Sequence, residues 1–343
     1  MSKDERPNRV PTSDDVALLA GVSRSAVSRT FTAGASVAPA TREKVISAAK
    51  ALGYRVNYLA RGLSQQRTNL VALVVSDMDN SLRARTVDFL ARGLAGLGFR
   101  PLLLPTEPGE DVSYLIDMML NYNVTGTIVT SDTPPAEIAQ ECAAYGVPLV
   151  LINKPEVGTH VSNVSIDTAT AGRMAAQELA DVGCERIGIV SQRRASHTIG
   201  QRKAAFIVTA RALGLDIAGD FHGAVQNYSG GAEAAAAFAA SGVAVDGIYC
   251  VNDFMALGFL DHLRRLSDLR VPEDIKLVAC DDIAEAAWRS YDITSVRQDP
   301  KAVADAAIAA LSKRLEAPEA VQPPVIIPVT LVRRGSTGAS DPT

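Results

Sequence analysis

The sequence predicts a small all-α head with a helix-turn-helix, followed by an α/β body of two Rossmann-like lobes. One observation is the uneven charge over the 343 residues: residues 1–67 contain 11 Lys or Arg and 5 Asp or Glu, net +6, whereas the others contain 23 and 33, net −10. A second is the change at Asn69 from helical apolar spacing to short β-rich runs alternating with helical stretches. The length itself suits about two domains.

Composition excludes several classes of protein. Hydrophobic residues make up 47% and charged residues 21%, which is ordinary globular usage. No apolar run approaches the roughly 18 residues of a membrane span, and the N-terminus lacks the apolar stretch of a signal peptide. The cysteines are scattered, without Cys-x-x-Cys spacing, at Cys142, Cys184, Cys250 and Cys280. We therefore predict a cytoplasmic protein with reduced thiols, no membrane association, no metal site and no cofactor.

Two short helices joined by a turn are predicted within residues 12–31. Thr12 and Asp15 have the spacing of a capping box, and Ser23 can cap the second helix. Gly21 ends the first helix, since the residue after a last turn often needs positive φ. The residues predicted to repeat at helical spacing are Val16, Leu19, Ala20, Val27 and Phe31.

A third helix follows, with Pro39 in its first turn and Gly53 at its end. Its predicted inner stripe is Val45, Ile46, Ala49 and Leu52. We expect the three helices to close a small core around Val16, Val27, Ile46 and Leu52.

The second helix offers polar side chains outward, namely Arg24, Ser25, Ser28 and Arg29. Arginine and short hydroxyl side chains are suited to phosphates and base edges, and the positive charge lies in the same segment. We predict that this head binds DNA. The alternative is a three-helix subdomain whose polar face is merely solvated.

Residues 15–29, Asp-Val-Ala-x-x-Ala-Gly-Val-Ser-x-x-x-Val-Ser-Arg, resemble the head of the LacI/GalR family of transcriptional regulators. The resemblance extends through residues 41–45 and 53–63. It implies base reading by Arg24 and Ser25, and it gives as DNA-binding residues Thr12, Ser23, Arg24, Ser25, Ser28, Arg29, Thr41, Asn57, Ala60 and Leu63. This chain departs from the family with Ala26 in place of Thr, which removes a hydrogen-bond donor, and with Thr32 in place of Asn.

Residues 55–67 form the predicted linker. Gly62 would cost a helix here up to about 1 kcal/mol relative to Ala, and so short a helix is marginal in water. The resemblance implies a hinge helix that orders on operator DNA and inserts Leu63 into the minor groove as an apolar wedge. The alternative is that Leu63 packs on the body.

The body is predicted to alternate strands and helices, which indicates parallel sheets covered on both faces. Expected strands are 70–75, 102–104, 127–129, 148–152, 161–166, 187–190, 247–251, 275–280 and 325–333. Expected helices are 83–97, 111–121, 135–144, 168–182, 198–213, 229–240, 253–265 and 300–315. Two successive α/β units suggest two lobes with a ligand cleft beyond the carboxyl ends of the strands.

The family resemblance also covers the body, through residues 252–258, 281–283 and 294–298. It implies a type I periplasmic-binding-protein-like fold in which the chain crosses between lobes three times. The effector-binding residues carried over are Leu82, Arg83, Asn153, Ser196, Thr198, Arg202, Val225, Asn252 and Asp281. For Asp253 and Asp282, structural contacts are as plausible as effector binding.

Several departures make the expected cleft polar and rich in cations. Arg83 stands where many members have an aromatic residue, and Val225 stands where an aromatic often closes the cleft. We therefore hypothesise an anionic effector, such as a sugar acid or phosphorylated sugar, held by Arg202 and Arg83. Alternatively, Arg83 and the pair Arg193 and Arg194 point to solvent or pair with acids.

The predicted function is a sequence-specific DNA-binding transcriptional regulator, expected to be a repressor and controlled by a sugar or sugar acid. Its expected partners are a palindromic operator, the effector and a second copy of the chain, which would pair through the helices at 83–97 and 111–121. The alternative is a sugar-binding protein or carbohydrate enzyme with the same body. No phosphate loop, nucleophile elbow or metal-ligand spacing supports an enzyme.

The predicted organisation is a head at 1–54, a linker at 55–67, a body at 68–335 and a disordered tail at 336–343.

Overall fold

The computed structural model describes residues 10–32, 35–55, 68–107, 113–130, 135–194 and 196–338. The chain divides into two units, Met1–Thr68 and Asn69–Thr343, each with its own contacts. This boundary lies next to the predicted start of the body at residue 68.

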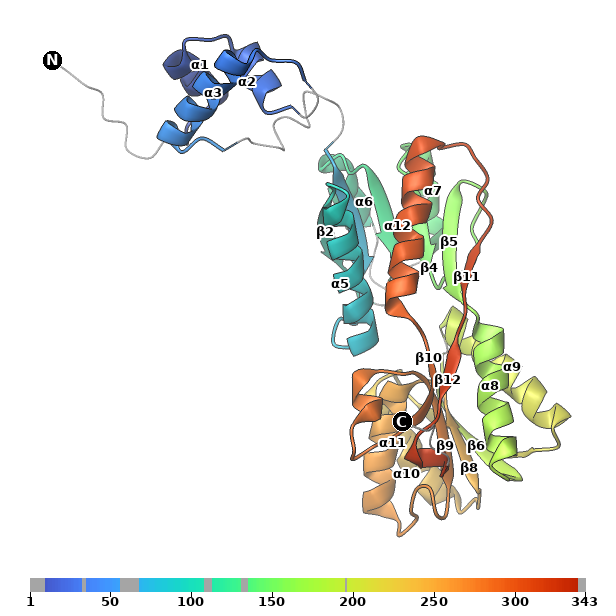
Figure 1. Ribbon diagram of the computed structural model, residues 1–343. Coiled ribbons are helices and arrows are strands. Elements are labelled where there is room, and N and C mark those ends of the chain that lie inside the picture. The colour runs from blue at the N-terminus through green and yellow to red at the C-terminus, as the bar shows by residue number, and fades with distance from the viewer. Residues whose placement is uncertain are drawn as a thin grey trace. The chain divides into compact units, whose positions relative to one another are not determined.

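The first unit contains three helices, drawn in blue in Figure 1: α1 (Ser13–Ala20), α2 (Arg24–Thr30) and α3 (Pro39–Leu52). Thr12 and Asp15 form the predicted capping box, and Ser23 caps α2. Gly21 and Gly53 end α1 and α3 with φ of 65° and 66°, a conformation that costs glycine little.

The core of this unit differs from the predicted core at one position. Val16, Val27, Val45, Ala48 and Ala49 are buried, with Leu52 and Phe31 packed against them. Ile46 is 49% exposed, so its placement in the core was wrong, and Leu19, predicted only to repeat at helical spacing, is 56% exposed. The stripe of α3 runs through residues 45, 48, 49 and 52, which turns residue 46 outward.

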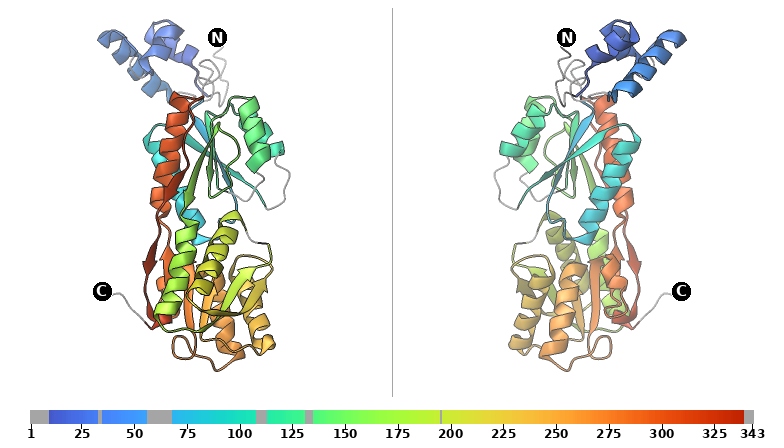
Figure 2. Two further views of the ribbon diagram at one scale, coloured as in Figure 1. Left: turned by 90° about the vertical axis from the view of Figure 1, so that its right-hand side faces the viewer. Right: turned by 90° about the vertical axis from the view of Figure 1, so that its left-hand side faces the viewer.

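The second unit consists of two lobes, each a six-stranded sheet between helices (Figures 1 and 2). The first sheet has the order β11-β5-β4-β3-β1-β2, and the second has the order β12-β10-β9-β8-β6-β7. Every pairing is parallel except β10 with β12. In the first lobe β2 and β3 lie on opposite sides of β1, and in the second lobe β7 and β8 lie on opposite sides of β6. The carboxyl ends of the strands at such a reversal are the usual ligand site of this kind of sheet.

The first lobe contains β1 (Leu70–Val75), α5 (Ser81–Gly96), β2 (Arg100–Pro105), α6 (Ser113–Asn121), β3 (Gly126–Val129), α7 (Pro135–Ala144), β4 (Leu149–Ile152), β5 (Val161–Ile166), α12 (Pro300–Glu316) and β11 (Val325–Ile327). Helices α5 and α12 pack together on one face of its sheet, and α6 and α7 lie on the other (Figure 2).

The second lobe contains α8 (Thr168–Asp181), β6 (Arg186–Gln192), α9 (His197–Ala212), β7 (Asp216–Gly223), α10 (Tyr228–Ser241), β8 (Gly247–Cys250), α11 (Asp253–Leu266), β9 (Lys276–Asp281), η1 (Ala284–Ala287), β10 (Thr294–Arg297), β12 (Thr330–Val332) and η2 (Gly335–Thr337). Helices α8 and α9 pack as one pair and α10 and α11 as another. The chain crosses between the lobes after β5, after β10 and after β11, the three crossings that the family resemblance implies.

Four features of the body differ from the predictions. Strand β7 was missed because its sequence, Asp-Ile-Ala-Gly-Asp-Phe-His-Gly, is an edge strand without an apolar run. Strand β10 was missed as well. The single strand predicted at 325–333 is two strands in different sheets, and Pro328, which has no N–H to donate, lies between them.

The fourth difference is the tail, because disorder from residue 336 was predicted and the described part of that tail is ordered. Ser336 and Thr337 are each 2% exposed. The Ser336 hydroxyl donates to the Leu277 carbonyl at 2.6 Å, and the Thr337 hydroxyl donates to Glu178 at 3.2 Å. These polar side chains are buried because they are hydrogen-bonded, a contact that the Gly- and Ser-rich composition could not reveal.

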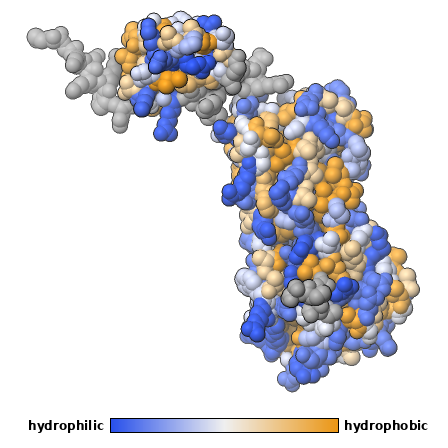
Figure 3. Space-filling model, in the orientation of Figure 1, coloured by the Kyte–Doolittle hydropathy of each residue, from blue (hydrophilic) through white to orange (hydrophobic). Residues whose placement is uncertain are grey.

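The surface of both units mixes polar and apolar side chains, as Figure 3 shows for one face. No helix among the described residues is long and apolar enough to cross a membrane. The four cysteines are free and buried, as predicted for inert thiols.

Candidate functional site

The first candidate surface is the outer face of α2. Arg24, Ser25, Ser28 and Arg29 are all exposed, whereas Val27 and Thr30 face the core. Arg24 Nε lies 3.7 Å from Asp14 Oδ1, with both side chains largely in solvent, so this ion pair holds Arg24 weakly. The helix therefore presents two cations and two hydroxyl groups to a partner.

Three predicted DNA-binding side chains already make hydrogen bonds within the head, and in one of these bonds the Ser23 and Ser25 hydroxyls lie 2.9 Å apart. The Thr12 hydroxyl donates to Asp15 Oδ2 at 2.7 Å, and the Ser23 hydroxyl accepts from the Ala26 N–H at 3.3 Å. Thr41 is half-buried on α3. Asn57, Ala60 and Leu63, with the rest of the predicted hinge helix, lie outside the described residues.

Arg42 is a head residue that the sequence did not single out. Its guanidinium donates to the Thr30 carbonyl at 3.0 Å and to the Ala35 carbonyl at 3.4 Å. It thereby satisfies a carbonyl at the end of α2 and ties that helix to α3. From the sequence alone, an arginine beside a DNA-binding motif is equally consistent with this packing role and with phosphate contact.

The second candidate site is a cleft between the lobes of the body. Its inner compartment, about 100 Å³, lies at the carboxyl ends of the strands and is lined from both lobes. The predicted effector residues that line it are Leu82, Arg83, Asn153, Ser196, Thr198, Arg202, Asn252 and Asp281. Val225 does not line it, although it lines an adjoining outer compartment of about 450 Å³.

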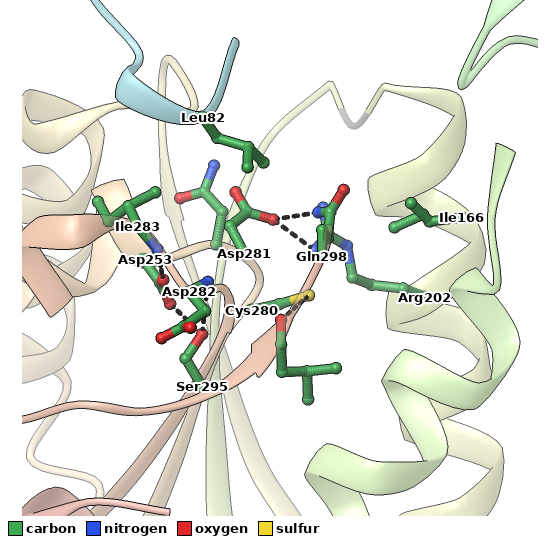
Figure 4. Close-up of polar contacts among 12 residues, drawn as sticks. Leu82, Ile166, Arg202, Asp253, Cys280, Asp281, Asp282, Ile283, Ser295 and Gln298 are labelled. Atoms are coloured by element: carbon green, nitrogen blue, oxygen red, sulfur yellow. Dashed lines mark hydrogen bonds and ion pairs between the residues drawn. The ribbon is translucent and has the colours of Figure 1, made fainter. Parts of the chain in front are cut away.

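A buried ion pair forms the base of the inner compartment (Figure 4). Arg202 on α9 and Asp281 at the end of β9 have side chains 4% and 7% exposed, with Nη1 and Oδ1 3.0 Å apart. Gln298 Nε2 also donates to Oδ1, whereas Oδ2 accepts no hydrogen bond from the described residues. Arg202 Nε is buried without a partner among them. Asp281 Oδ2 thus retains acceptor capacity, which suits a ligand hydroxyl.

The electrostatics of this pair balance two opposed effects. Burial raises the pKa of Asp281, and the adjacent Arg202 guanidinium opposes that rise. A neutral, hydrogen-bonding ligand does not disturb this charge balance.

Asp253 and Asp282 serve structural contacts, one of the two alternatives that the sequence left open. Asp253 accepts from the Ser295 hydroxyl at 2.7 Å and from the Ile283 N–H at 2.9 Å (Figure 4). Asp282 binds Arg297 at 2.6 Å and Arg334 at 2.5 Å. Neither aspartate lines the inner compartment. Burial raises the pKa of Asp253 to about 7.

Asn252 and Asn153 are fixed by their own hydrogen bonds. Asn252 Oδ1 caps α11 at the Met255 N–H, and Nδ2 donates to the Gln226 carbonyl at 3.1 Å. Asn153 adopts a φ of 57°, which asparagine tolerates, and its Oδ1 accepts from the Ile166 N–H at 3.0 Å. Both residues therefore shape the wall of the cleft.

Arg83 is the cleft cation that the sequence singled out beside Arg202, and it is paired with a carboxylate. Arg83 Nη1 donates to Asp77 at 2.7 Å and to the Ser76 hydroxyl at 3.0 Å, so Arg83 pairs with an acid, as one alternative held. Arg193 and Arg194 are exposed, and Arg194 lines the outer compartment. Lys154, Gln226 and Gln298 line the inner compartment and were not predicted as site residues. Lys154 and Gln226 belong to no family motif, whereas Gln298 lies in the motif at 294–298 and could have been found there.

The described residues contain no group of histidine, cysteine and carboxylate side chains that could hold a metal ion.

Comparisons with known proteins agree with this architecture. Residues 12–57 match the bacterial regulatory proteins of the lacI family, and residues 176–337 match a periplasmic binding protein-like domain. The HTH-type transcriptional regulator CelR of Thermobifida fusca is 33% identical over 84% of this chain and 87% of its own length.

Two solved structures resemble the whole chain. A complex of the regulator CelR with cellobiose has a TM-score of 0.71 at 29% identity, covering 95% of this chain and 99% of that one. The lac repressor dimer bound to operator and the anti-inducer ONPF has a TM-score of 0.85 at 24% identity, covering 96% and 100%, which shows a shared fold.

The helix-turn-helix head joined to a two-lobed body with a cleft defines a DNA-binding transcriptional regulator. The chain belongs to the lacI family of bacterial regulatory proteins.

Proposed function

We propose that this regulator is a repressor that binds a palindromic operator as a homodimer and responds to a sugar in the cleft of its body. The observation that carries the proposal is the presence, in one chain, of the exposed α2 face and a polar interlobe cleft. A ligand that binds both lobes favours one arrangement of the lobes over others, and this shift is the means of control.

For the DNA side, we propose base contacts from Arg24 and Ser25 and phosphate contacts from Ser28, Arg29 and Thr41. In the linker, we propose DNA contacts from Asn57 and Ala60 and a minor-groove wedge from Leu63. The hydroxyls of Thr12 and Ser23 cap helices, so we assign these two residues mainly to placing the helix ends. Pairing of two heads is expected because a single head makes few base contacts.

For the effector, we propose a polyhydroxylated sugar, with contacts from the predicted cleft residues. The ion pairs of Arg202 with Asp281 and Arg83 with Asp77 favour a neutral sugar. The anionic sugar derivative is the second candidate, because Arg83, Lys154 and Arg194 all line the outer compartment. The CelR complex with cellobiose supports the sugar class.

The DNA proposal is tested by a mobility-shift titration of the full chain on selected palindromic sites and on random DNA, at several salt concentrations. A protein lacking residues 1–67 is the comparison. We expect the full chain to prefer one palindrome and the shortened protein to bind neither DNA. A full chain without any preference would leave the alternative, a sugar-binding protein or carbohydrate enzyme with the same body.

The charge of the effector is tested by calorimetry with paired neutral and acidic sugars. Arg83→Ala removes a cation that lines the cleft, and Arg85→Ala removes an exposed cation of the same helix as the matched control. If the effector is a neutral sugar, we expect the neutral member of a pair to bind more tightly than the acid, both in wild type and in the two variants. Tighter binding of the acid, lost in Arg83→Ala alone, would establish the anionic candidate.

A further inference from the structure

The cleft continues from the inner compartment into the outer one. Both compartments are lined by Asn80, Arg83, Lys154, Ser196 and Gln226. The inner compartment, at about 100 Å³, is smaller than the roughly 300–1,000 Å³ of ordinary ligand sites. The outer compartment, at about 450 Å³, falls within that range. The cleft therefore has room for a ligand larger than one that contacts only the buried pair Arg202 and Asp281.

The outer wall is held in place by close backbone packing. The loop between β7 and α10, residues 224–227, lies directly on the first turn of α10: a Cβ at Gly230 would be 1.8 Å from the Val225 carbonyl oxygen. The Ala224 N–H donates to Glu233 Oε2 at 2.7 Å. Only glycine at 230 permits so close an approach, so this packing of the loop depends on Gly230.

The same loop joins the two compartments. Asn252 lines the inner compartment, and its Nδ2 donates to the carbonyl of Gln226, a residue that lines both compartments. One hydrogen bond therefore connects the loop of the outer wall to Asn252 in the inner wall. Two adjoining compartments that share lining residues suit one ligand that extends through both.

The chemistry of the outer compartment fits a second neutral sugar unit. Val225, 45% exposed, and Phe254 offer apolar surface, and Gln192 and Asn227 offer amides. A sugar ring has an apolar face and hydroxyl edges, and amides both donate and accept hydrogen bonds. Charges of both signs line this space, with Asp77 and Asp79 as well as Arg83, Lys154 and Arg194, and Arg83 is paired with Asp77, so the charges largely offset one another.

We propose that the effector is a two-unit glycoside of disaccharide size. One ring occupies the inner compartment against Asp281 and Arg202, and the second lies in the outer compartment against Val225 and Phe254. This inference rests on the proposed sugar-controlled function and specifies the length of the sugar.

The test is calorimetric titration of the full-length protein with neutral monosaccharides, including glucose and galactose, and with neutral disaccharides, including cellobiose, maltose and lactose. We expect one disaccharide to bind at least about tenfold more tightly than its constituent monosaccharides, since only the disaccharide fills both compartments.

Two substitutions locate the second unit. Val225→Trp fills the outer compartment from an exposed loop position, and Val208→Trp is the matched control on the exposed face of α9. We expect Val225→Trp to weaken the disaccharide about tenfold or more and to change monosaccharide binding by less than about twofold. Val208→Trp should change neither affinity. Arg194→Ala and its control Arg193→Ala test the polar side of the outer compartment by the same affinity measurements. We expect Arg194→Ala to weaken the disaccharide more than Arg193→Ala does.

The outcomes separate the length of the ligand from the function of the protein. Equal affinity for monosaccharide and disaccharide, unaffected by Val225→Trp, would overturn the two-unit ligand and leave sugar control in place. If no saccharide of either size binds while operator binding persists, both the sugar effector and its length are overturned. A disaccharide preference lost in Val225→Trp alone supports the proposal.

Discussion

At the scale of single residues, the body buries charged side chains in the cleft and pairs them with opposite charges. Arg202 and Asp281 are separated by 79 positions in sequence and meet in the cleft at 3.0 Å. An ion pair in such a place is costly to break, because removal of one partner leaves the other charge buried and unpaired. The pair keeps the cleft polar and fixes its shape before any ligand binds.

This pair gives the first prediction. Arg202→Met should lower the free energy of unfolding of the body by about 3–5 kcal/mol, since Asp281 then stays buried without its cation. The double variant Arg202→Met/Asp281→Leu should lose less than the two single variants together. Arg83→Met, whose pair with Asp77 is partly solvated, should cost less than about 1 kcal/mol. Urea unfolding of these variants and of Asp281→Leu measures the values, and strictly additive losses would show that the pair is not coupled.

Asp253 gives a prediction on pH. Burial raises the pKa of Asp253 to about 7, so from about pH 4 to 7 the folded chain binds more protons at this site than the unfolded chain. Its contribution to stability is therefore largest at low pH and is lost as the pH rises through this window. Asp253→Asn, which resembles the protonated side chain, should remove that loss.

The measurement for Asp253 is the urea midpoint of wild type and Asp253→Asn at pH 5 and pH 8. Wild type should lose more stability than the variant between these values. Parallel losses in the two proteins would show that Asp253 stays ionised in the folded chain.

At the scale of elements, helix α2 is stabilised from within the head, which leaves its outer face available for DNA. Ser23 caps its N-terminus, Arg42 binds a carbonyl at its end, and Val27 anchors its inner face. Arg24 and Arg29 contribute little to this packing. A change at either arginine therefore reports on DNA contact more than on folding.

The two arginines of α2 should differ in their effect on DNA binding. Arg24→Ala should cost about 1–3 kcal/mol of operator affinity and relax sequence preference, because it removes a base contact. Arg29→Ala should weaken binding to operator and to random DNA alike, because it removes a phosphate contact. It should also reduce the slope of log affinity against log salt concentration by about 1. Mobility shifts across a salt series distinguish the two. Identical profiles for both variants would contradict these assignments.

At the scale of the whole molecule, the head and the body have separate hydrophobic cores. The head core surrounds Val16, Val27 and Val45, and no buried residue of that cluster belongs to the body clusters among the described residues. The net charge of +6 over residues 1–67 and of −10 over the rest follows the same division. A negative net charge on the body disfavours its contact with DNA phosphate, so we expect contact to be made mainly by the basic segment.

Separate cores predict separate unfolding. Scanning calorimetry of the full chain should show two transitions, and a saccharide from the binding panel should raise only that of the body. At 100 times its dissociation constant, the ligand should add about 2.7 kcal/mol to the stability of the body. One transition that shifts as a unit would mean that the head and the body unfold together.

The sequence by itself determined the elements whose signals are local. The capping residues Thr12 and Ser23, the glycines that end α1 and α3, and the strand–helix alternation are each contained in a short window. The family motif added candidate site residues, most of which line one cleft. The edge strand β7 was not predicted, because its residues contain no apolar run.

Only the tertiary structure decided which of these residues meet. Parallel strands bring their carboxyl ends together from distant parts of the chain, so the pairing of Arg202 with Asp281 and the lining by Lys154 and Gln226 have no local signature. The same holds for the outer compartment, whose wall depends on Gly230 touching the backbone of Val225. Local spacing encodes helices and caps, whereas the shape of a cleft is a property of non-local packing.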